Sequence, residues 1–150
     1  WEEYKRYRRP ATLMMLDLDN FKAINDTYGH LFGDYVLRET AGRLKARTRR
    51  VDILARYGGE EFVLLAPNTD TETGLVLAER LRTAVAGARF EQGKNSIQVT
   101  VSVGLSSTEL QEFSSFQDLL EASDQALYSA KRSGKNCVYE YGRGMVPRSS

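Results

Sequence analysis

Apolar and polar residues alternate along most of the chain in segments that match the repeats of strands and helices. Ala11–Leu16 is an almost continuous apolar run of strand length, which predicts a central strand buried on both faces. Between Ile97 and Leu105, apolar residues alternate with polar or small ones, which predicts a half-buried strand. Gly58-Gly59 is typical of a tight turn between two paired strands. The other predicted strands are Ile53–Tyr57, Glu61–Ala66 and Val138–Tyr141.

Helices are predicted where apolar residues recur every three or four positions. Thr69 and Glu72 have the spacing of a capping box, so we expect a helix to begin there. Trp1–Arg9 is predicted to be the end of a charged helix that Pro10 stops. Three other helices are predicted. The first is Phe21–Tyr28, which Gly29 ends, and the second is Gly33–Arg47. The third begins at Ser115 and ends at Gly134.

These elements follow one another as β-α-α-β-β-α-β-α-β, with a hairpin inside alternating helices and strands. The order predicts an α+β fold with one mixed, mainly antiparallel central sheet flanked by helices, a class that includes ferredoxin-like folds. We expect one domain at residues 1–141, followed at 142–150 by a linker or cloning remnant rich in glycine and serine. Because the first residue is Trp1 rather than Met, we also expect the chain to be part of a longer protein.

The composition excludes several classes of protein. The 150 residues suffice for one domain, and 41% hydrophobic with 27% charged residues fits neither a disordered chain nor a membrane protein. No apolar run is long enough for a bilayer span, so we expect no membrane contact by this domain. A net charge of +1 argues against binding to a nucleic acid polymer. The single cysteine, Cys137, cannot form an internal disulfide, which favours a reducing cytoplasm.

Acidic residues lie at the ends of two predicted strands. Asp17 and Asp19 come at the end of the apolar run and share one face if the strand continues, and Glu60 and Glu61 follow the glycine turn. Each pair alone is compatible with an ordinary turn or with solvated acids. If the two strands are neighbours, however, the acids converge and can hold divalent metal ions.

A further group of polar residues lies on or near the predicted helices. Asn25 shares a helical face with Phe21 and Ile24, so its amide is either a satisfied, half-buried group or a ligand contact. Asp34 suits the start of a helix because of the helix dipole, but its carboxylate could also accept hydrogen bonds from a guanine edge. Three lysines could neutralise phosphates or simply be solvated: Lys22, Lys131 and Lys135.

Three segments together resemble the GGDEF family of diguanylate cyclases. They are DLDNFKAINDTYGHLFGD, RYGGEEF and SDQALYSAKRSGKN, and their order and spacing are highly specific. The resemblance extends from about Tyr4 to Tyr141, and the signature loop is GGEEF at residues 58–62. It implies that two GTP molecules are condensed into cyclic di-GMP and two pyrophosphates by a homodimer with one GTP on each protomer. It also implies a fold resembling nucleotidyl cyclases and polymerase palm domains.

The resemblance implies roles for individual residues. The ligands of Mg²⁺ or Mn²⁺ would be Asp17, the Leu18 carbonyl, Glu60 and Glu61, and Glu60 would also be the candidate base for the 3′-hydroxyl. The guanine would be recognised by Asn25 and Asp34, and His30 would help to line the substrate site. The groups that bind triphosphate or stabilise the transition state would be Lys22, Lys131 and Lys135. Lys135 stands where many members have Arg, so a bidentate phosphate contact becomes a point charge.

A second constellation, an RxxD motif, lies upstream of the signature loop. It runs from Arg49 to Asp52, and from its spacing alone it is compatible with the charged end of a helix. In the family this placement marks an inhibitory site for the product, which Arg56 and Arg80 commonly complete. The alternative function is a non-catalytic cyclic di-GMP receptor that uses only this motif, but the intact acids of the signature loop argue against it.

One departure from the family concerns the start of the chain. Members usually carry an LTGLxNR-like stretch before the first helix, and the sequence begins after it. In the family this stretch helps to order the helix and to link it to a sensor or receiver domain. We therefore expect intact chemistry together with weak dimerisation. The resemblance also implies a bacterial, cytoplasmic location, with any membrane anchor outside this sequence.

Overall fold

The computed structural model describes residues 1–148, apart from the side chain of Glu3. Its centre is a six-stranded sheet in which all neighbouring strands are antiparallel except one parallel pair, β6 with β7. The strands, in spatial order, are β2 (Ile53–Arg56), β3 (Glu61–Pro67), β1 (Ala11–Leu18), β6 (Val101–Ser107), β7 (Val138–Glu140) and β8 (Gly144–Met145). The mixed, mainly antiparallel sheet predicted from the sequence is confirmed.

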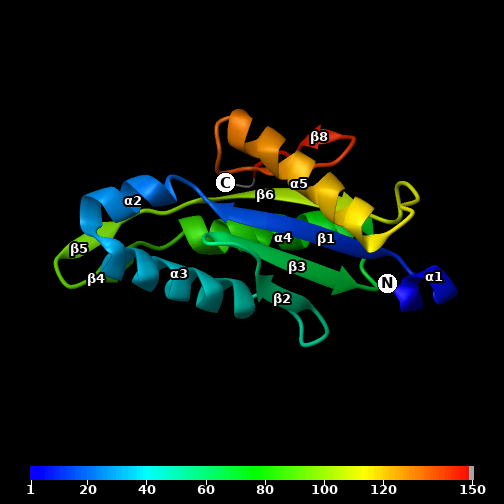
Figure 1. Ribbon diagram of the computed structural model, residues 1–150, viewed down its shortest axis with the longest axis horizontal. Coiled ribbons are helices and arrows are strands. Elements are labelled where there is room, and N and C mark those ends of the chain that lie inside the picture. Colours follow the sequence, from blue (N-terminus) through cyan, green and yellow to red (C-terminus); the bar gives the residue numbers. More distant parts are fainter. Residues whose placement is uncertain (149–150) are drawn as a thin grey trace.

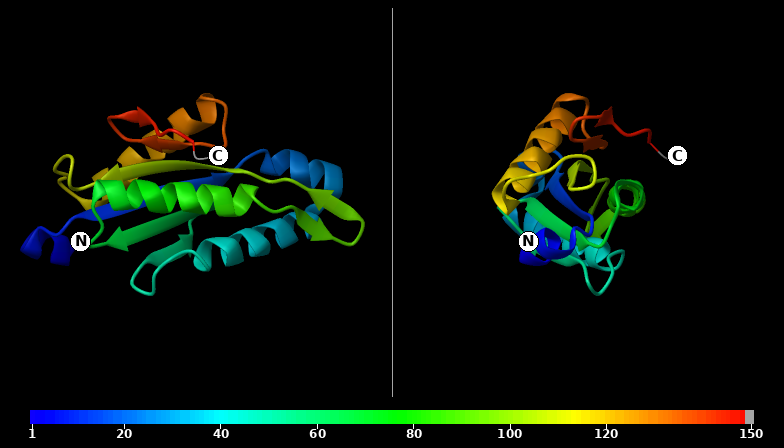
Figure 2. Two further views of the ribbon diagram at one scale, coloured as in Figure 1. Left: turned by 180° about the vertical axis from the view of Figure 1, so that it is seen from behind. Right: turned by 90° about the vertical axis from the view of Figure 1, so that its right-hand side faces the viewer.

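Helices cover both faces of this sheet. Helix α5 (Phe116–Arg132) lies across one face, against β6 and β1 (Figure 1). Helix α4 (Thr71–Ala86) covers the other face, with α3 (His30–Lys45) beside it (Figure 2). Among the described residues, none of the helices has the length and apolar character needed to cross a membrane.

Three smaller elements complete the fold. Helix α1 (Glu2–Tyr7) precedes β1, and α2 (Phe21–Tyr28) follows it at the opposite end of the strand (Figure 1). A separate hairpin, β4 (Phe90–Gln92) with β5 (Asn95–Ile97), projects near α2 and α3. Phe90 anchors this hairpin in the core, and the Arg43 guanidinium lies 3.8 Å above its ring. The hairpin was not among the predicted elements.

The core confirms β1 as a central strand and corrects the prediction for β6. Leu13 to Leu16 have no exposed surface, as the apolar run indicated. The predicted strand from Ile97 to Leu105 is interrupted at residues 98–100, and every residue of β6 is buried rather than half-buried. The small residues face α5 instead of solvent. A Cβ atom at Gly104 would lie only 2.2 Å from the Ser123 carbonyl oxygen, so the helix packs directly on this strand because residue 104 is glycine.

The capping box predicted at the start of α4 is wrong. The N-cap is Asp70, whose carboxylate accepts a hydrogen bond from Thr73 N at 2.8 Å. Thr69 instead donates its hydroxyl to the Pro67 carbonyl, which holds it in the preceding loop. The start predicted for α5 is confirmed, since the Ser115 hydroxyl accepts from Asp118 N at 3.1 Å.

Two boundaries also differ from the prediction. Helix α3 begins at His30, because the turn between α2 and α3 needs only Gly29, with a φ of 90°. Part of the predicted C-terminal linker belongs to the sheet, where β8 pairs with β7 and Val146 N donates to the Val138 carbonyl at 2.9 Å. Val146 packs against the core, so apolar contact as well as backbone pairing holds this segment.

Candidate active site at the ends of strands β1 and β3

The acidic residues of the two predicted strand ends lie side by side. Strands β1 and β3 are antiparallel neighbours, with Asp17 opposite Glu61. Leu18 N donates to the Glu60 carbonyl at 3.2 Å, which extends the pairing to the last residue of β1. The convergence expected from the sequence is therefore present in the structure.

A tight glycine turn presents Glu60 and Glu61. Tyr57 N donates to the Glu61 carbonyl at 2.8 Å, which closes the turn between β2 and β3. A Cβ atom at Gly59 would have open space around it, so a ligand can approach the backbone here. The Arg56 guanidinium donates to the Gly59 carbonyl at 2.7 and 3.2 Å. Arg56 thus fixes the backbone immediately before Glu60.

The electrostatics of this acidic cluster favour a bound cation. Burial raises the pKa of Glu60, and the neighbouring Asp17 carboxylate raises it further. Burial likewise raises the pKa of Glu61, followed by the negative charges of Asp17 and Asp124. Carboxylates that disfavour one another's ionisation are stabilised in their charged form by a cation placed between them.

Lys131, on the last turn of α5, supplies a positive charge to the end of β1. Its Nζ lies 2.9 Å from Asp17 Oδ1 and 2.8 Å from Asp19 Oδ1. It also donates to the carbonyls of Asp17 and Leu18, at 3.2 and 3.1 Å. Burial lowers the pKa of Lys131, but the hydrogen bonds to the two aspartates outweigh this and raise it overall. Lys131 therefore places an ammonium in the centre of the site.

Asp19 has a different position from the one that the sequence indicated. It is 3% exposed, and both of its oxygens are fully engaged, so it is not placed to ligate a metal ion. Oδ1 accepts from Ser102 and Lys131, and Oδ2 accepts from Thr100 Oγ1 at 2.7 Å and Asn136 N at 3.0 Å. Burial raises its pKa, but these hydrogen bonds lower it overall. Asp19 joins the ends of β1, β6 and α5 with the loop that follows α5.

The predicted guanine-binding residues lie on α2 and α3. Asn25 is half-buried, and its Oδ1 atom has no hydrogen-bond partner among the described residues. A Cβ atom at Gly33 would lie 1.8 Å from this Oδ1, so the close approach of the two helices requires glycine there. Gly33 is a site-forming residue that the sequence analysis did not identify. Its only signal was a glycine at the start of the helix predicted for Gly33–Arg47.

The other substrate-site candidates are exposed, except Lys135, which is half-buried. His30 is the first residue of α3, and Asp34 is on the same helix one turn later. Because α3 begins at His30, Asp34 is not in the first turn, and the helix dipole does not account for an acid there. Lys22 is exposed on the first turn of α2. Lys135 is in the loop after α5, and its Nζ donates to Asn20 Oδ1 at 2.7 Å.

The RxxD residues are joined to each other. The Asp52 side chain has no exposed surface, and its Oδ1 lies 2.9 Å from Arg49 Nη2. Asp52 Oδ2 accepts from Arg49 N at 2.8 Å, so the carboxylate shapes the turn before β2. Arg49 also donates to the Pro67 carbonyl but keeps about half of its side chain exposed, and Arg80 donates to the Arg47 carbonyl at 3.3 Å. Asp52 is thus closed to a ligand in this conformation, whereas Arg49 and Arg80 are accessible.

The oxygens at the strand ends suit a divalent cation. In the part of the chain that the structure describes, no three His, Cys, Asp or Glu side chains are already gathered as a metal-binding cluster. The carboxylate of Asp17 and the carbonyl of Leu18 nevertheless both contact the Lys131 ammonium, so both oxygens face a positive charge. Carboxylate and carbonyl oxygens are also the ligands that Mg²⁺ prefers.

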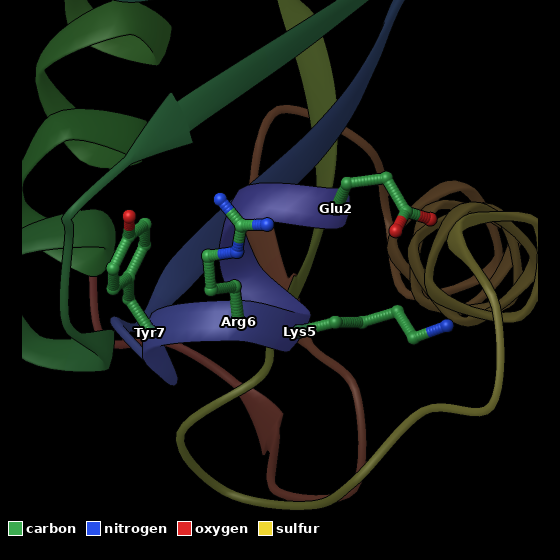
Figure 3. Close-up of a pocket in the computed structure, with 4 residues that line it drawn as sticks. All are labelled: Glu2, Lys5, Arg6 and Tyr7. Carbon is green, nitrogen blue, oxygen red and sulfur yellow. The ribbon is translucent and has the colours of Figure 1, made fainter.

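The hollow beside α1 is not part of this site. It has a volume of about 560 Å³ and is lined by Glu2, Lys5, Arg6 and Tyr7 (Figure 3). These residues precede β1, whereas Asp17 and Leu18 lie at its other end (Figure 1). No predicted site residue lines this hollow.

Comparison with known proteins agrees with the geometry. Residues 1–137 match the family described as "Diguanylate cyclase, GGDEF domain". The response regulator PleD of Caulobacter vibrioides is 44% identical over 131 residues, which are 86% of this chain and 29% of PleD. The chain therefore spans less than a third of this relative.

Solved structures are similar over nearly the whole chain. The GGDEF domain of DgcB from Caulobacter crescentus, in complex with c-di-GMP, has a TM-score of 0.88 and 31% identity, covering 93% of this chain and 82% of that one. The active GGEEF domain of a diguanylate cyclase from Vibrio cholerae has a TM-score of 0.85 and 35% identity, covering 95% and 90%. The chain belongs to the GGDEF family of diguanylate cyclase domains.

Proposed function

We propose that this protein is a diguanylate cyclase that condenses two GTP molecules into cyclic di-GMP and two pyrophosphates. The 3′-oxygen of each GTP attacks the α-phosphorus of the other, which forms two phosphodiester bonds and expels two pyrophosphates. The observation that carries the proposal is the convergence of Asp17, Glu60 and Glu61 with the Lys131 ammonium at the ends of β1 and β3. Divalent metal held by these carboxylates, together with the Lys131 ammonium, would supply the charge neutralisation that attack on a phosphorus atom requires.

The metal ligands in this proposal are Asp17, the Leu18 carbonyl, Glu60 and Glu61. The observation in support is that these groups lie together on paired strands and that two of them already hold an ammonium. Bound Mg²⁺ or Mn²⁺ would neutralise charge on the reacting phosphate and favour ionisation of the 3′-hydroxyl. The raised pKa values of Glu60 and Glu61 are consistent with carboxylates that a bound cation would stabilise in their charged form.

Glu60 is proposed as the base that removes the 3′-hydroxyl proton. It directly follows Gly59, where open space lets a ligand approach the backbone. A raised pKa makes a carboxylate a better proton acceptor. Glu60 holds this proton until the product has formed and then releases it to solvent.

Substrate recognition is assigned to α2, α3 and the end of α5. Asn25 and Asp34 would read the guanine edge, and Asn25 Oδ1 has an unused acceptor for this purpose. His30 would line the same site from the start of α3. The ammonium groups of Lys22, Lys131 and Lys135 would bind the triphosphate or stabilise the transition state.

Product inhibition is proposed at the RxxD region. Arg49, Arg56 and Arg80 are exposed residues, and guanidinium groups can bind phosphates and stack on purines. Asp52 is assigned to holding Arg49 in place, because its carboxylate is buried against that residue. The solved DgcB domain in complex with c-di-GMP supports binding of the product by such a domain.

Two protomers would form the active unit, since the product is a two-fold symmetric ring. The experiment is incubation with GTP and Mg²⁺, followed by chromatography of the products over a hundredfold range of protein concentration. We expect cyclic di-GMP, its loss on chelation, and a specific activity that rises with protein concentration. The absence of cyclic di-GMP at every concentration would contradict the proposal.

A further inference from the structure

The Lys131 ammonium lies where a cation would bind at the end of β1. Its Nζ is 2.9 Å from Asp17 Oδ1 and 3.1 Å from the Leu18 carbonyl oxygen. These two oxygens belong to the set proposed above for the divalent metal. The Asp17 carbonyl and Asp19 Oδ1 complete the surroundings of the ammonium, at 3.2 and 2.8 Å. The protein thus places a positive charge of its own on metal-facing oxygens.

We infer that Lys131 is an internal counter-ion in the nucleotide-free protein and that a divalent metal must displace its ammonium from Asp17 and Leu18. The inference rests on the proposed metal site. Each of these oxygens has a second lone pair, so the competition arises from charge: an ammonium and a divalent metal on the same oxygens would lie close enough to repel one another strongly. In the metal-free protein Lys131 therefore neutralises the Asp17 carboxylate, and this lowers the affinity of the site for a metal ion.

Nucleotide binding would release this restraint. The phosphates of GTP offer the ammonium another set of anionic oxygens, and movement of Nζ toward them frees Asp17 and Leu18. Binding of nucleotide and binding of metal then favour one another, because each removes an obstacle to the other. Asp19 can stay in place, since its bonds with Thr100, Ser102 and Asn136 do not involve Lys131.

Lys135 offers a matched control on the same side of the site. It carries the same charge, but its Nζ donates to Asn20 Oδ1, an oxygen outside the proposed metal set. Removal of this charge changes the electrostatic field at longer range and frees none of the proposed ligands. A comparison of the two lysines therefore separates direct competition from general charge repulsion.

The test is titration of the nucleotide-free protein with Mn²⁺, with free Mn²⁺ measured by electron paramagnetic resonance. Lys131→Met removes the ammonium with little change in length, and Lys131→Gln is a second neutral variant in case the first fails to fold. We expect both to bind Mn²⁺ at least about tenfold more tightly than the wild type. Lys135→Met should stay within about threefold, because solvent screens its more distant charge. Thermal unfolding confirms that each variant is folded.

The outcomes separate this inference from the proposed function. Equal Mn²⁺ affinity in the wild type and both Lys131 variants would overturn the inference and leave the metal site intact. Equal tightening by Lys135→Met would also overturn it, since direct competition would not be needed. Binding that Asp17→Asn does not weaken, or no binding by any variant, would overturn the proposed ligands and the inference together.

Discussion

Replacement of Asp19 by alanine should destabilise the fold by about 3–5 kcal/mol, the usual cost of removing one partner from a buried ion pair. Asp19 is 3% exposed and accepts hydrogen bonds from Thr100, Ser102, Lys131 and Asn136 N. The variant leaves these donors without their common acceptor, and the ends of β1, β6 and α5 lose the group that joins them. In a protein of this size the loss corresponds to a fall of roughly 6–20 °C in the unfolding temperature.

The effect should depend on pH in a defined direction. The pKa of Asp19 is lowered in the folded protein, so its carboxylate contributes stability that is fully present above the unfolded pKa of about 4. This contribution is lost as the pH falls through the lower, folded pKa. Urea unfolding of wild type and Asp19→Ala should therefore show the largest difference near neutral pH and a smaller one in acid.

Ser102→Ala is the matched control, because it removes one donor to Asp19 and leaves the carboxylate in place. We expect it to cost about 1–3 kcal/mol, less than the loss of Asp19 itself. An Asp19→Ala variant within about 1 kcal/mol of wild type at neutral pH would refute the reasoning. A difference that stays constant into acid would refute it as well.

Three other variants test separate parts of the account. Asp34→Ala should lose most of its preference for GTP over ATP, because adenine lacks the donors that a carboxylate would read; unchanged relative rates with the two nucleotides would contradict this. Arg80→Ala should weaken cyclic di-GMP binding in calorimetric titration while initial turnover persists. Arg80→Ala tests product binding more directly than Arg49→Ala, because the latter would also remove the ion-pair partner of the buried Asp52 carboxylate. Gly104→Ala should destabilise the fold by at least about 1–3 kcal/mol, because its Cβ would lie 2.1 Å from Leu127 N; an unchanged unfolding temperature would be inconsistent with the packing described.

Much of the fold follows from local features of the sequence. The apolar run at Ala11–Leu16 specifies a strand that is buried on both faces, and the glycine pair specifies the turn before β3. The sequence left open whether these two strands are neighbours, and their pairing in the sheet places Asp17 opposite Glu61. The acidic core of the site was therefore predictable on the condition that the strands pair.

The rest depends on contacts between segments that are distant in sequence. Alternation in β6 indicated a solvent-facing side, but α5 covers that side because Gly104 admits its backbone. The burial of Asp19 needs donors more than eighty residues away, at Thr100 and Ser102. The ion pair with Arg49 that keeps a ligand from the Asp52 carboxylate likewise depends on the side-chain conformation adopted in the turn. Local spacing carries no information about these contacts.

The most direct test of the proposed chemistry is the rate of cyclic di-GMP formation by Glu60→Gln, with Glu121→Gln as the control. Both changes replace a carboxylate by an amide of the same shape, but Glu121 is an exposed residue of α5 nearly three turns before Lys131. The account predicts that Glu60→Gln lowers turnover by at least about 10²–10⁴-fold, since the base and a metal ligand are lost together, while Glu121→Gln keeps the wild-type rate. Equal turnover by Glu60→Gln and the wild type would contradict the assignment of the active site.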